Sequence, residues 1–247
     1  MSDKAATKSA LIVGVGHTQG VGAAVARRFA REGFDVTVFG RNEAKLATAL
    51  EGLKAINPSV RAEIGDVTDE ARVRKLVADC DRAEAPLEVA VFNAGGNWPK
   101  AYLDMDVEFL EQMWRVNALS GFIFSKAAVE TMLPRERGTI IFTGASGSLR
   151  GKAMFGGFAQ GKAALRALAQ SCAREFGPKG LHVAHVVIDG AVDGNRINTL
   201  LPDLKDKLGE DGLVGPDGIA ENYWHIHNQP RNAWTHELDV RPWGENW

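Results

Sequence analysis

Residues 158–162 read F-A-Q-G-K and open a stretch, F-A-Q-G-K-A-A-L-R-A-L-A-Q-S, whose Ala, Leu and Gln content favours a helix. On a helix, Phe158 and Lys162 lie one turn apart on the same face. A phenol at the first position would have an ammonium group beside it, which would lower the phenol pKa and help it exchange a proton near neutral pH. Phe158 has no hydroxyl. The chain is therefore an enzyme that lacks this acid, an enzyme that holds it elsewhere, or no enzyme.

A second candidate site is the glycine-rich turn V-G-V-G-H-T-Q-G-V-G-A-A-V, in which Gly16, Gly20 and Gly22 stand between an apolar run and a helical stretch. Such glycines let backbone amides approach a pyrophosphate at a helix N-terminus, where the helix dipole favours anions. The spacing G-x-x-x-G-x-G is one residue longer in its first gap than the common dinucleotide fingerprint. Because the turn has the required strand-turn-helix context, we favour nucleotide binding over a merely structural turn.

The cofactor preference is indicated about twenty residues further on, where NAD-dependent dehydrogenases often place an acid against the ribose 2′-hydroxyl. Here the second apolar run ends in F-G-R-N, and Gly40 is not acidic. Arg41 could instead pair with a 2′-phosphate, which favours NADP(H) over NAD(H). A solvated arginine at a helix start is the alternative interpretation.

The elements that must position these residues alternate between apolar runs and amphipathic stretches. This alternation predicts an α/β fold in one dinucleotide-binding domain over residues 1–247, with a doubly wound parallel sheet of about seven strands. The runs expected to form strands are 10–15, 35–39, 60–64, 87–92, 139–143, 181–188 and, less strongly, 233–240. Residues 190–215 are polar and glycine-studded, which is more typical of a substrate lid than of a plain connection. A helix is expected over 216–227.

Composition narrows the class of protein. The net charge of -2 leaves no electrostatic footprint for nucleic acid or an acidic membrane surface, and no apolar run is long enough to span a bilayer. We expect a cytoplasmic protein in which Cys80 and Cys172 are buried thiols rather than a disulfide. The closest histidine pairs, 182/185 and 225/227, have spacings that do not chelate easily, so no metal site is expected.

These motifs resemble those of the short-chain dehydrogenase/reductase family, and the resemblance covers essentially the whole chain in the right order. The matches are the family's glycine motif T-G-x-x-x-G-x-G, here Val15, Gly16, Gly20, Val21 and Gly22; its adenine-contacting D-V, here Asp66 and Val67; its N-N-A-G stretch, here Asn93, Ala94, Gly95 and Gly96; and the helix asparagine that helps to hold a proton-relay water, here Asn117. The resemblance implies a nicotinamide cofactor and a carbonyl or alcohol substrate. It also implies a homodimer or homotetramer.

The sequence departs from the family at the signature Y-x-x-x-K and at the serine thirteen residues before it. Phe158 stands at the tyrosine position and Ala145 at the serine position, whereas Lys162 is retained and is implied to bind the nicotinamide ribose. The usual P-G after the sixth strand reads Asp189-Gly190, and Gly194 stands where a threonine is expected. The resemblance implies that Gly190 and Val192 still border the nicotinamide.

Several residues are candidates to replace the missing hydroxyls. Ser146 lies one residue from the expected serine, so a small loop shift could bring it to the substrate carbonyl; bonding to its own backbone is the alternative. Tyr223 and Tyr102 could each act as a substitute acid, although packing is the commoner role for such residues. For Asp189 a structural role at the turn is favoured over an acid role.

The predicted pocket and the chain end are aromatic. By analogy with the family fold, Phe158, Trp98 and Phe155 would wall the nicotinamide pocket and favour an apolar substrate. Four of the six tryptophans fall in the last 24 residues, so this end is expected to pack against the domain or another subunit; they are Trp224, Trp234, Trp243 and Trp247.

Two functional hypotheses follow. The first is an NAD(P)-dependent oxidoreductase of short-chain type with an altered proton donor, whose functional groups are Asn117, Ser146 and Lys162 beside Phe158. The second is a catalytically silent NADP-binding sensor or partner subunit. Fold analogy alone does not choose between them, because function resides in the site.

Overall fold

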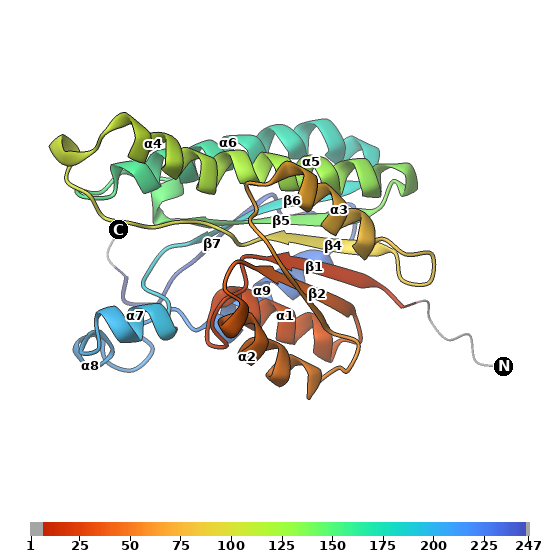
Figure 1. The fold of residues 1–247 in the computed structure, drawn as a ribbon, viewed down its shortest axis with the longest axis horizontal. Helices are drawn as coiled ribbons and strands as arrows, with labels where there is room; N and C mark the ends of the chain where they lie inside the picture. Colours follow the sequence, from red (N-terminus) through yellow and green to blue (C-terminus); the bar gives the residue numbers. More distant parts are fainter. Residues whose placement is uncertain (1–6, 246–247) are drawn as a thin grey trace.

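The computed structural model describes residues 7–245 and is built around one sheet of seven strands (Figure 1). The strands lie in the order β3-β2-β1-β4-β5-β6-β7, and every neighbouring pair is parallel. Their bounds are β1 Ser9–Val13, β2 Asp35–Gly40, β3 Arg61–Ile64, β4 Leu87–Phe92, β5 Gly138–Ala145, β6 Leu181–Ile188 and β7 Glu237–Val240. The predicted doubly wound parallel sheet is confirmed, and the first six apolar runs end within two residues of the strands they predicted.

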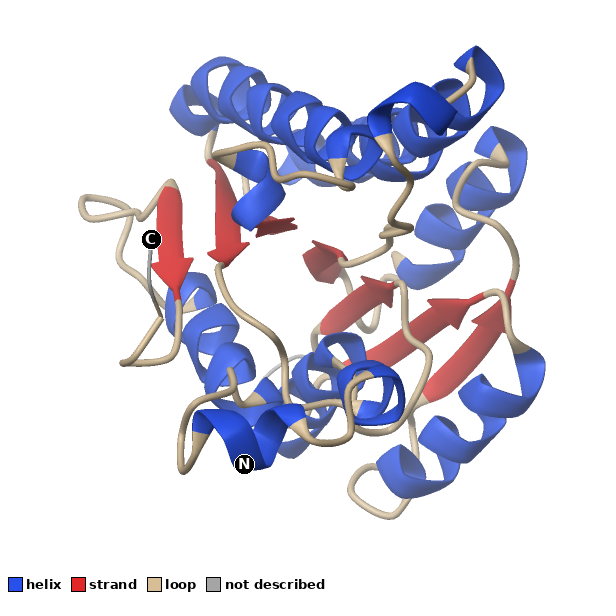
Figure 2. Ribbon diagram, turned by 90° about the vertical axis from the view of Figure 1, so that its left-hand side faces the viewer, coloured by secondary structure: helices blue, strands red, loops and turns tan. Residues whose placement is uncertain are grey.

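Helices cover both faces of the sheet (Figures 1 and 2). On one face lie α1 (Val21–Arg31), α2 (Glu43–Lys54) and α9 (Pro216–His227), and on the other lie α3 (Glu70–Cys80), α4 (Val107–Trp114), α5 (Ser120–Met132) and α6 (Gly156–Phe176). The helix predicted over 216–227 is therefore confirmed. None of the helices in the described part of the chain is both long and apolar enough to cross a bilayer.

Five of the strands, β1, β2, β4, β5 and β6, contribute to two hydrophobic cores, one on either face of the sheet. In β1, for example, Ala10 and Ile12 belong to the core under α1 and α9, whereas Leu11 and Val13 belong to the core under α3, α5 and α6. Successive side chains of a strand point to opposite faces, so a strand covered on both sides must be apolar throughout. This explains why β1, β4 and β6 are continuous buried runs rather than alternating ones.

The segment 190–215 lies across the carboxyl end of the sheet and contains two short helices, α7 (Asn195–Leu200) and α8 (Leu204–Leu208). It is anchored on two loops of the domain. The Gln19 amide donates to Asn195 Oδ1 at 3.3 Å, and Arg196 donates to the carbonyl of Asn97. The segment thus bridges the loop after β1 and the loop after β4.

The aromatic chain end packs only in part as expected. Trp224 lies edge-on to Phe29, with ring centroids 5.4 Å apart, and Trp234 stacks on His182 at 4.7 Å. Trp243 is 86% exposed and does not pack against the domain, so for this residue only the expected contact with another subunit stays a prediction; Trp247 lies outside the described residues. The last strand begins at Glu237, later than predicted.

Tyr223 is fully buried in the core between α9 and the sheet, and its hydroxyl lies 2.8 Å from Thr143 Oγ1. Burial raises the pKa of this phenol. The suggestion that Tyr223 folds over the pocket as an acid is therefore wrong, and the packing interpretation holds.

Substituting Tyr223→Phe should lower the free energy of unfolding by about 1–3 kcal/mol, because it leaves the buried Thr143 hydroxyl without its partner. Urea denaturation measures this change. The double variant Tyr223→Phe/Thr143→Val removes both groups and should be less destabilised than the single variant. Unchanged stability of Tyr223→Phe would contradict the expected hydrogen bond.

Candidate active site and cofactor cleft

A cleft of about 250 Å³ opens at the carboxyl ends of β1 to β4. The loops that follow these strands converge there because the strand order reverses between β1 and β4, which is where open α/β sheets bind ligands. Seven residues predicted from the sequence line it, namely Gly16, Arg41, Asp66, Val67, Asn93, Ala94 and Gly95. His17 and Lys45 line it as well.

The glycine turn at the floor of this cleft leads into α1, whose N-cap residue is Gly20, followed by Val21 and Gly22 in the first turn. The first turn has no acidic residue, and no side chain caps its amides, so these donors suit an anion. The glycines have different roles. A Cβ on Gly22 would lie 2.9 Å from Asn93 Nδ2, whereas a Cβ on Gly16 would meet no atom within 4 Å. Gly22 thus permits packing against Asn93, while Gly16 leaves room for a pyrophosphate.

The rim of the cleft carries the predicted arginine. Arg41 Nη1 lies 3.6 Å from Asp66 Oδ2, and both side chains are about half-exposed. Burial alone would raise the pKa of Asp66, but the hydrogen bonds from Thr68 and the Arg41 guanidinium lower it. Lys45 lines the same cleft from the first turn of α2, while Arg41 lies just before that helix. Sequence reasoning missed Lys45.

Two buried polar side chains meet beside this cleft. Asn117 sits in a π-helical turn, Arg115–Leu119, donates to the carbonyls of Gly96 and Met113 at 3.0 and 2.9 Å, and accepts from the Gly96 amide at 3.2 Å. Lys162 Nζ donates to the carbonyl of Thr143 at 2.8 Å. A Cβ on Gly95 would lie 2.9 Å from Asn117 Oδ1 and 3.3 Å from Lys162 Nζ, so this glycine keeps the space between them open.

Lys162 is 5% exposed and has no carboxylate partner among the described residues. Burial disfavours the charged ammonium and lowers the pKa of Lys162 to about 8. A buried amine that titrates near neutral pH can give or take a proton under physiological conditions.

A second pocket, of about 480 Å³, lies between the turn after β5, the start of α6 and the 190–215 segment. Ser146, Phe155, Phe158 and Gly190 line it, together with α8 of the 190–215 segment. The Ser146 hydroxyl makes no hydrogen bond with the residues described, so the suggested bonding to its own backbone is not observed. Gly147 lets the turn pack on the Phe158 ring, because a Cβ there would come within 2.9 Å of it.

The walls of this pocket are less apolar than expected. Arg150 and Lys152 line it alongside the phenylalanines. Trp98 is not among its lining residues; it folds back over Gly96, and a Cβ on that glycine would lie 1.8 Å from the indole. The expectation of a wall formed by three aromatic residues is therefore wrong for Trp98.

Asp189, the first residue after β6, has a structural partner. Its buried carboxylate accepts two hydrogen bonds from Arg150, both at 2.9 Å, and Arg241 lies 3.8 Å away. The favoured structural role fits this arrangement, although the partner is a guanidinium rather than the turn amides. Val192 pairs with Val214 in an isolated bridge that closes the base of the 190–215 segment. Tyr102 is 81% exposed on the surface before α4 and does not line the pocket.

Comparison with known proteins gives the family. The short chain dehydrogenase model matches residues 8–201. A short-chain dehydrogenase/reductase of Armillaria gallica is 33% identical over 70% of this chain and 67% of its own. The crystal structure of a short-chain dehydrogenase from Rhodopseudomonas palustris superposes with a TM-score of 0.79 at 34% identity, over 97% of this chain and 100% of its own. A single-substitution variant of the actinorhodin polyketide ketoreductase with NADPH shares the fold with a TM-score of 0.84 at 23% identity, over 96% of each chain.

The chain therefore belongs to the short-chain dehydrogenase family, whose members are oxidoreductases that bind NAD or NADP. The donor set of the cleft fits such a cofactor, since uncapped helix amides face the pyrophosphate position and cationic groups stand on the rim.

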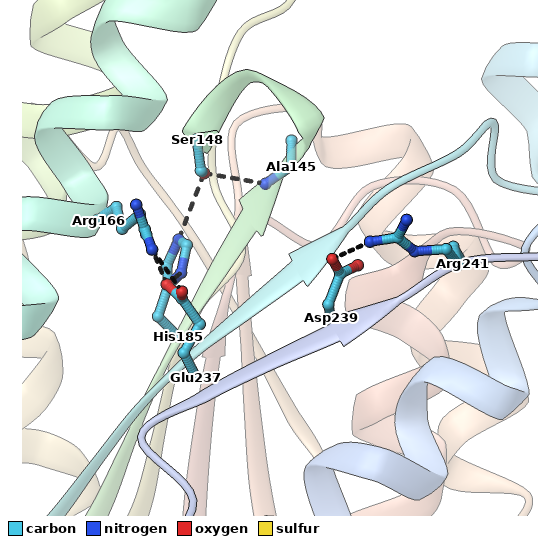
Figure 3. Close-up of polar contacts among 7 residues, drawn as sticks. All are labelled: Ala145, Ser148, Arg166, His185, Glu237, Asp239 and Arg241. Carbon is cyan, nitrogen blue, oxygen red and sulfur yellow. Dashed lines mark hydrogen bonds and ion pairs between the residues drawn. The ribbon is translucent and has the colours of Figure 1, made fainter. Parts of the chain in front are cut away.

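Sequence reasoning missed one polar network behind the pocket. Four residues from four separate elements form one chain of contacts (Figure 3). Ser148 lies next to His185, His185 lies next to Glu237, and Glu237 pairs with Arg166. His182 and His185 lie three residues apart in β6, so their side chains face opposite sides of the sheet. His182 indeed stacks on Trp234, whereas His185 reaches Ser148 on the other side.

We expect stability to fall in acid because two histidines are buried in the neutral form. Burial lowers the pKa of His185 and of His227 to about 4. Histidines in the unfolded chain have pKa values near 6.5, so between about pH 4 and pH 6.5 the unfolded chain binds more protons than the native state. The free energy of unfolding should therefore decrease as the pH falls from about 6.5 to 4. Urea titrations at several pH values measure this slope. The variant His227→Gln should flatten it, and a slope independent of both histidines would contradict the burial argument.

Proposed function

We propose that the protein is an NADP(H)-dependent oxidoreductase that reduces a carbonyl compound or oxidises a secondary alcohol. The position of Lys162 carries this proposal. Gly95, where an added Cβ would lie 3.3 Å from the buried Nζ, lines the cofactor cleft, and Phe158, one helical turn before Lys162, lines the second pocket. A titratable amine in that position can serve a reaction in which substrate and cofactor meet.

When bound, the nicotinamide would supply or accept a hydride. The chain's own groups must manage the proton. In reduction, the carbonyl carbon gains the hydride and its oxygen becomes an alkoxide, which takes a proton from a water hydrogen-bonded to the Lys162 ammonium. Lys162 then becomes neutral and regains a proton from solvent. Ser146, which lines the pocket, would donate a hydrogen bond to the same oxygen.

Asn117 has a positioning role in this scheme. Its amide is fully buried and ties the Gly96 backbone to the Met113 carbonyl at the end of α4. It thereby keeps the loop after β4 close to Lys162, where a relay water would sit. Residues 190–215 would act as a lid, because Gln19 and Asn97 anchor them across both clefts.

A homodimer or homotetramer is part of the proposal. Four apolar side chains form a stripe on and before α4, and all are at least 41% exposed; they are Leu103, Val107, Leu110 and Trp114. On α4 the spacing of three and four residues between Val107, Leu110 and Trp114 is that of a helix–helix contact, and Leu103 lies in the turn before the helix. A cytoplasmic location is also proposed, because the free thiols Cys80 and Cys172 suit a reducing compartment.

The first experiment is a turnover screen of the purified protein. It would use 4-nitrobenzaldehyde, acetophenone and ethyl acetoacetate with NADPH or NADH, and cyclohexanol with NADP⁺. Conversion that depends on the cofactor supports the proposal. Tight NADPH binding without conversion of any compound would instead favour a silent sensor or partner subunit.

The cofactor preference should depend on the two cations at the rim. We expect Arg41→Ala to weaken NADPH binding by roughly 10-fold or more, through loss of one charge-assisted contact, and to leave NADH binding nearly unchanged. Lys45→Ala should have a smaller effect in the same direction. Isothermal titration measures the dissociation constants of NADPH and NADH for the wild type and for each variant. Lys126→Ala, on the outer face of α5, is the control, and equal weakening of both cofactors by Arg41→Ala would rule out a 2′-phosphate contact.

The proton role of Lys162 predicts a pH profile. Reduction needs the ammonium, so kcat for reduction should fall as the pH rises above about 8, and kcat for oxidation should fall as the pH drops below it. We expect Lys162→Met to lower kcat by roughly 10²-fold or more. The control Lys126→Met should keep the wild-type rate. The double variant Phe158→Tyr/Ala145→Ser should raise kcat. A pH profile of kcat that is unchanged in Lys162→Met would assign the proton to another group.

A further inference from the structure

Ser146, in the turn at the end of β5 (residues 145–148), lines the pocket. Ser148 closes this turn through its contacts with Ala145 and His185 (Figure 3). The Ser148 hydroxyl oxygen accepts a hydrogen bond from the Ala145 amide at 3.1 Å, which closes the turn on itself. The same oxygen lies 3.3 Å from Nε2 of His185, a fully buried residue of β6. The turn is therefore tied to the neighbouring strand by one side-chain contact.

His185 is in turn held by the edge strand and by α6. Its Nδ1 lies 3.0 Å from Oε2 of Glu237 in β7, and Glu237 accepts two hydrogen bonds from Arg166, at 2.7 and 2.6 Å. Arg166 follows Lys162 by one helical turn, so the helix that bears Phe158 and Lys162 also ends this chain of contacts. One chain of contacts thus joins four elements, with the imidazole between Ser148 and Glu237.

The proton positions along this chain follow from charge. Arg166 and His185 hold the pKa of Glu237 at about 2, so the carboxylate is ionised and can only accept. Burial lowers the pKa of His185 to about 4, so the imidazole is neutral and has one N–H. That proton must lie on Nδ1, facing Glu237. Nε2 is then an acceptor, and the Ser148 hydroxyl donates to it.

Two glycines make this arrangement possible. A Cβ on Gly144 would lie 2.3 Å from Nε2 of His185, so only glycine leaves room for the ring beneath the turn. A Cβ on Gly147 would lie 2.9 Å from the Phe158 ring on the other side. The turn is clamped between His185 and Phe158, and Ser146 stands between these two contacts.

The order serine, histidine, carboxylate is also that of a hydrolase triad. Ser148 is 4% exposed and does not line the pocket, and its oxygen is occupied by the Ala145 amide. It is thus shielded from any substrate, and the network has a structural use.

We propose that His185 is a positioning residue: with its proton fixed on Nδ1 by Glu237, it holds Ser148 and so aims the Ser146 hydroxyl at the substrate oxygen. The catalytic part of this inference rests on the proposed oxidoreductase function. The tautomer and the rigidity of the turn do not depend on it.

The test is a double-mutant cycle with the carbonyl compound that the wild-type protein reduces fastest in the screen. Ser146→Ala should lower kcat/KM by roughly 10-fold in the wild type, but less than threefold in the Ser148→Ala background, where the turn is no longer aimed. Most of the loss in Ser148→Ala should appear in kcat. Ser125→Ala, a buried α5 serine bonded to the Phe122 carbonyl, is the matched control and should leave the Ser146→Ala effect at its full size. Equal effects of Ser146→Ala with and without Ser148 would overturn the inference.

A second measurement decides the inference even if no compound is turned over. The ¹⁵N shifts of His185 should report a proton on Nδ1 in the wild type and a shift towards Nε2 in Glu237→Gln. Amide exchange at residue 145 should accelerate in Ser148→Ala and in His185→Gln but not in Ser125→Ala. A wild-type proton on Nε2, or exchange unaffected by both substitutions, would overturn the positioning role, whereas failure of the turnover screen alone counts against the proposed function.

Discussion

All seven strands run in one direction, and the rest of the structure depends on this constraint. Every loop that follows a strand must emerge at the same edge of the sheet. Glycine amides, Arg41 and the residues that line the two pockets therefore lie close together although they are far apart in the sequence. The sheet is covered on both faces, and its buried strands leave little room for polar side chains except at their ends. The reactive groups therefore stand where the strands end.

One face of α6 illustrates how that constraint creates chemistry. Phe158, Lys162 and Arg166 follow one another at intervals of one turn, yet they enter three different environments. The first lines the pocket, the second is buried against the Thr143 carbonyl, and the third ends in an ion pair with Glu237. The ammonium of Lys162 is thus far less compensated than the guanidinium of Arg166, which explains why its pKa falls to about 8.

The sequence was sufficient to predict the sheet and its parallel direction, because these depend on local patterns of apolar runs and amphipathic stretches. Seven of the residues singled out from the sequence motifs and from the family resemblance line the cleft at the ends of β1 to β4. The sequence did not reveal the contact of Ser148 with His185 or that of Arg150 with Asp189, since these partners are 37 and 39 residues apart and meet only through strand pairing. Tyr223 was misplaced for a related reason. The sequence of α9 predicts a helix but does not tell which of its faces is buried. The packing of α9 against α1 and the sheet decides where the phenol of Tyr223 points.

Phe158 and the network beneath the turn are best understood together. The ring packs on Gly147, and the turn that contains Gly147 is fixed from below by His185, so the ring edge and the Ser146 hydroxyl share one rigid frame. In a close-packed interior such a frame does not adjust freely to an added group. A hydroxyl placed on the Phe158 ring would therefore enter a pocket in which the Ser146 hydroxyl, in the proposed arrangement, is already held in place through Ser148 and His185. An acid on the Phe158 ring could not move without moving the turn that carries Ser146. In the proposed mechanism the proton comes from Lys162 instead, and this frame stays unchanged.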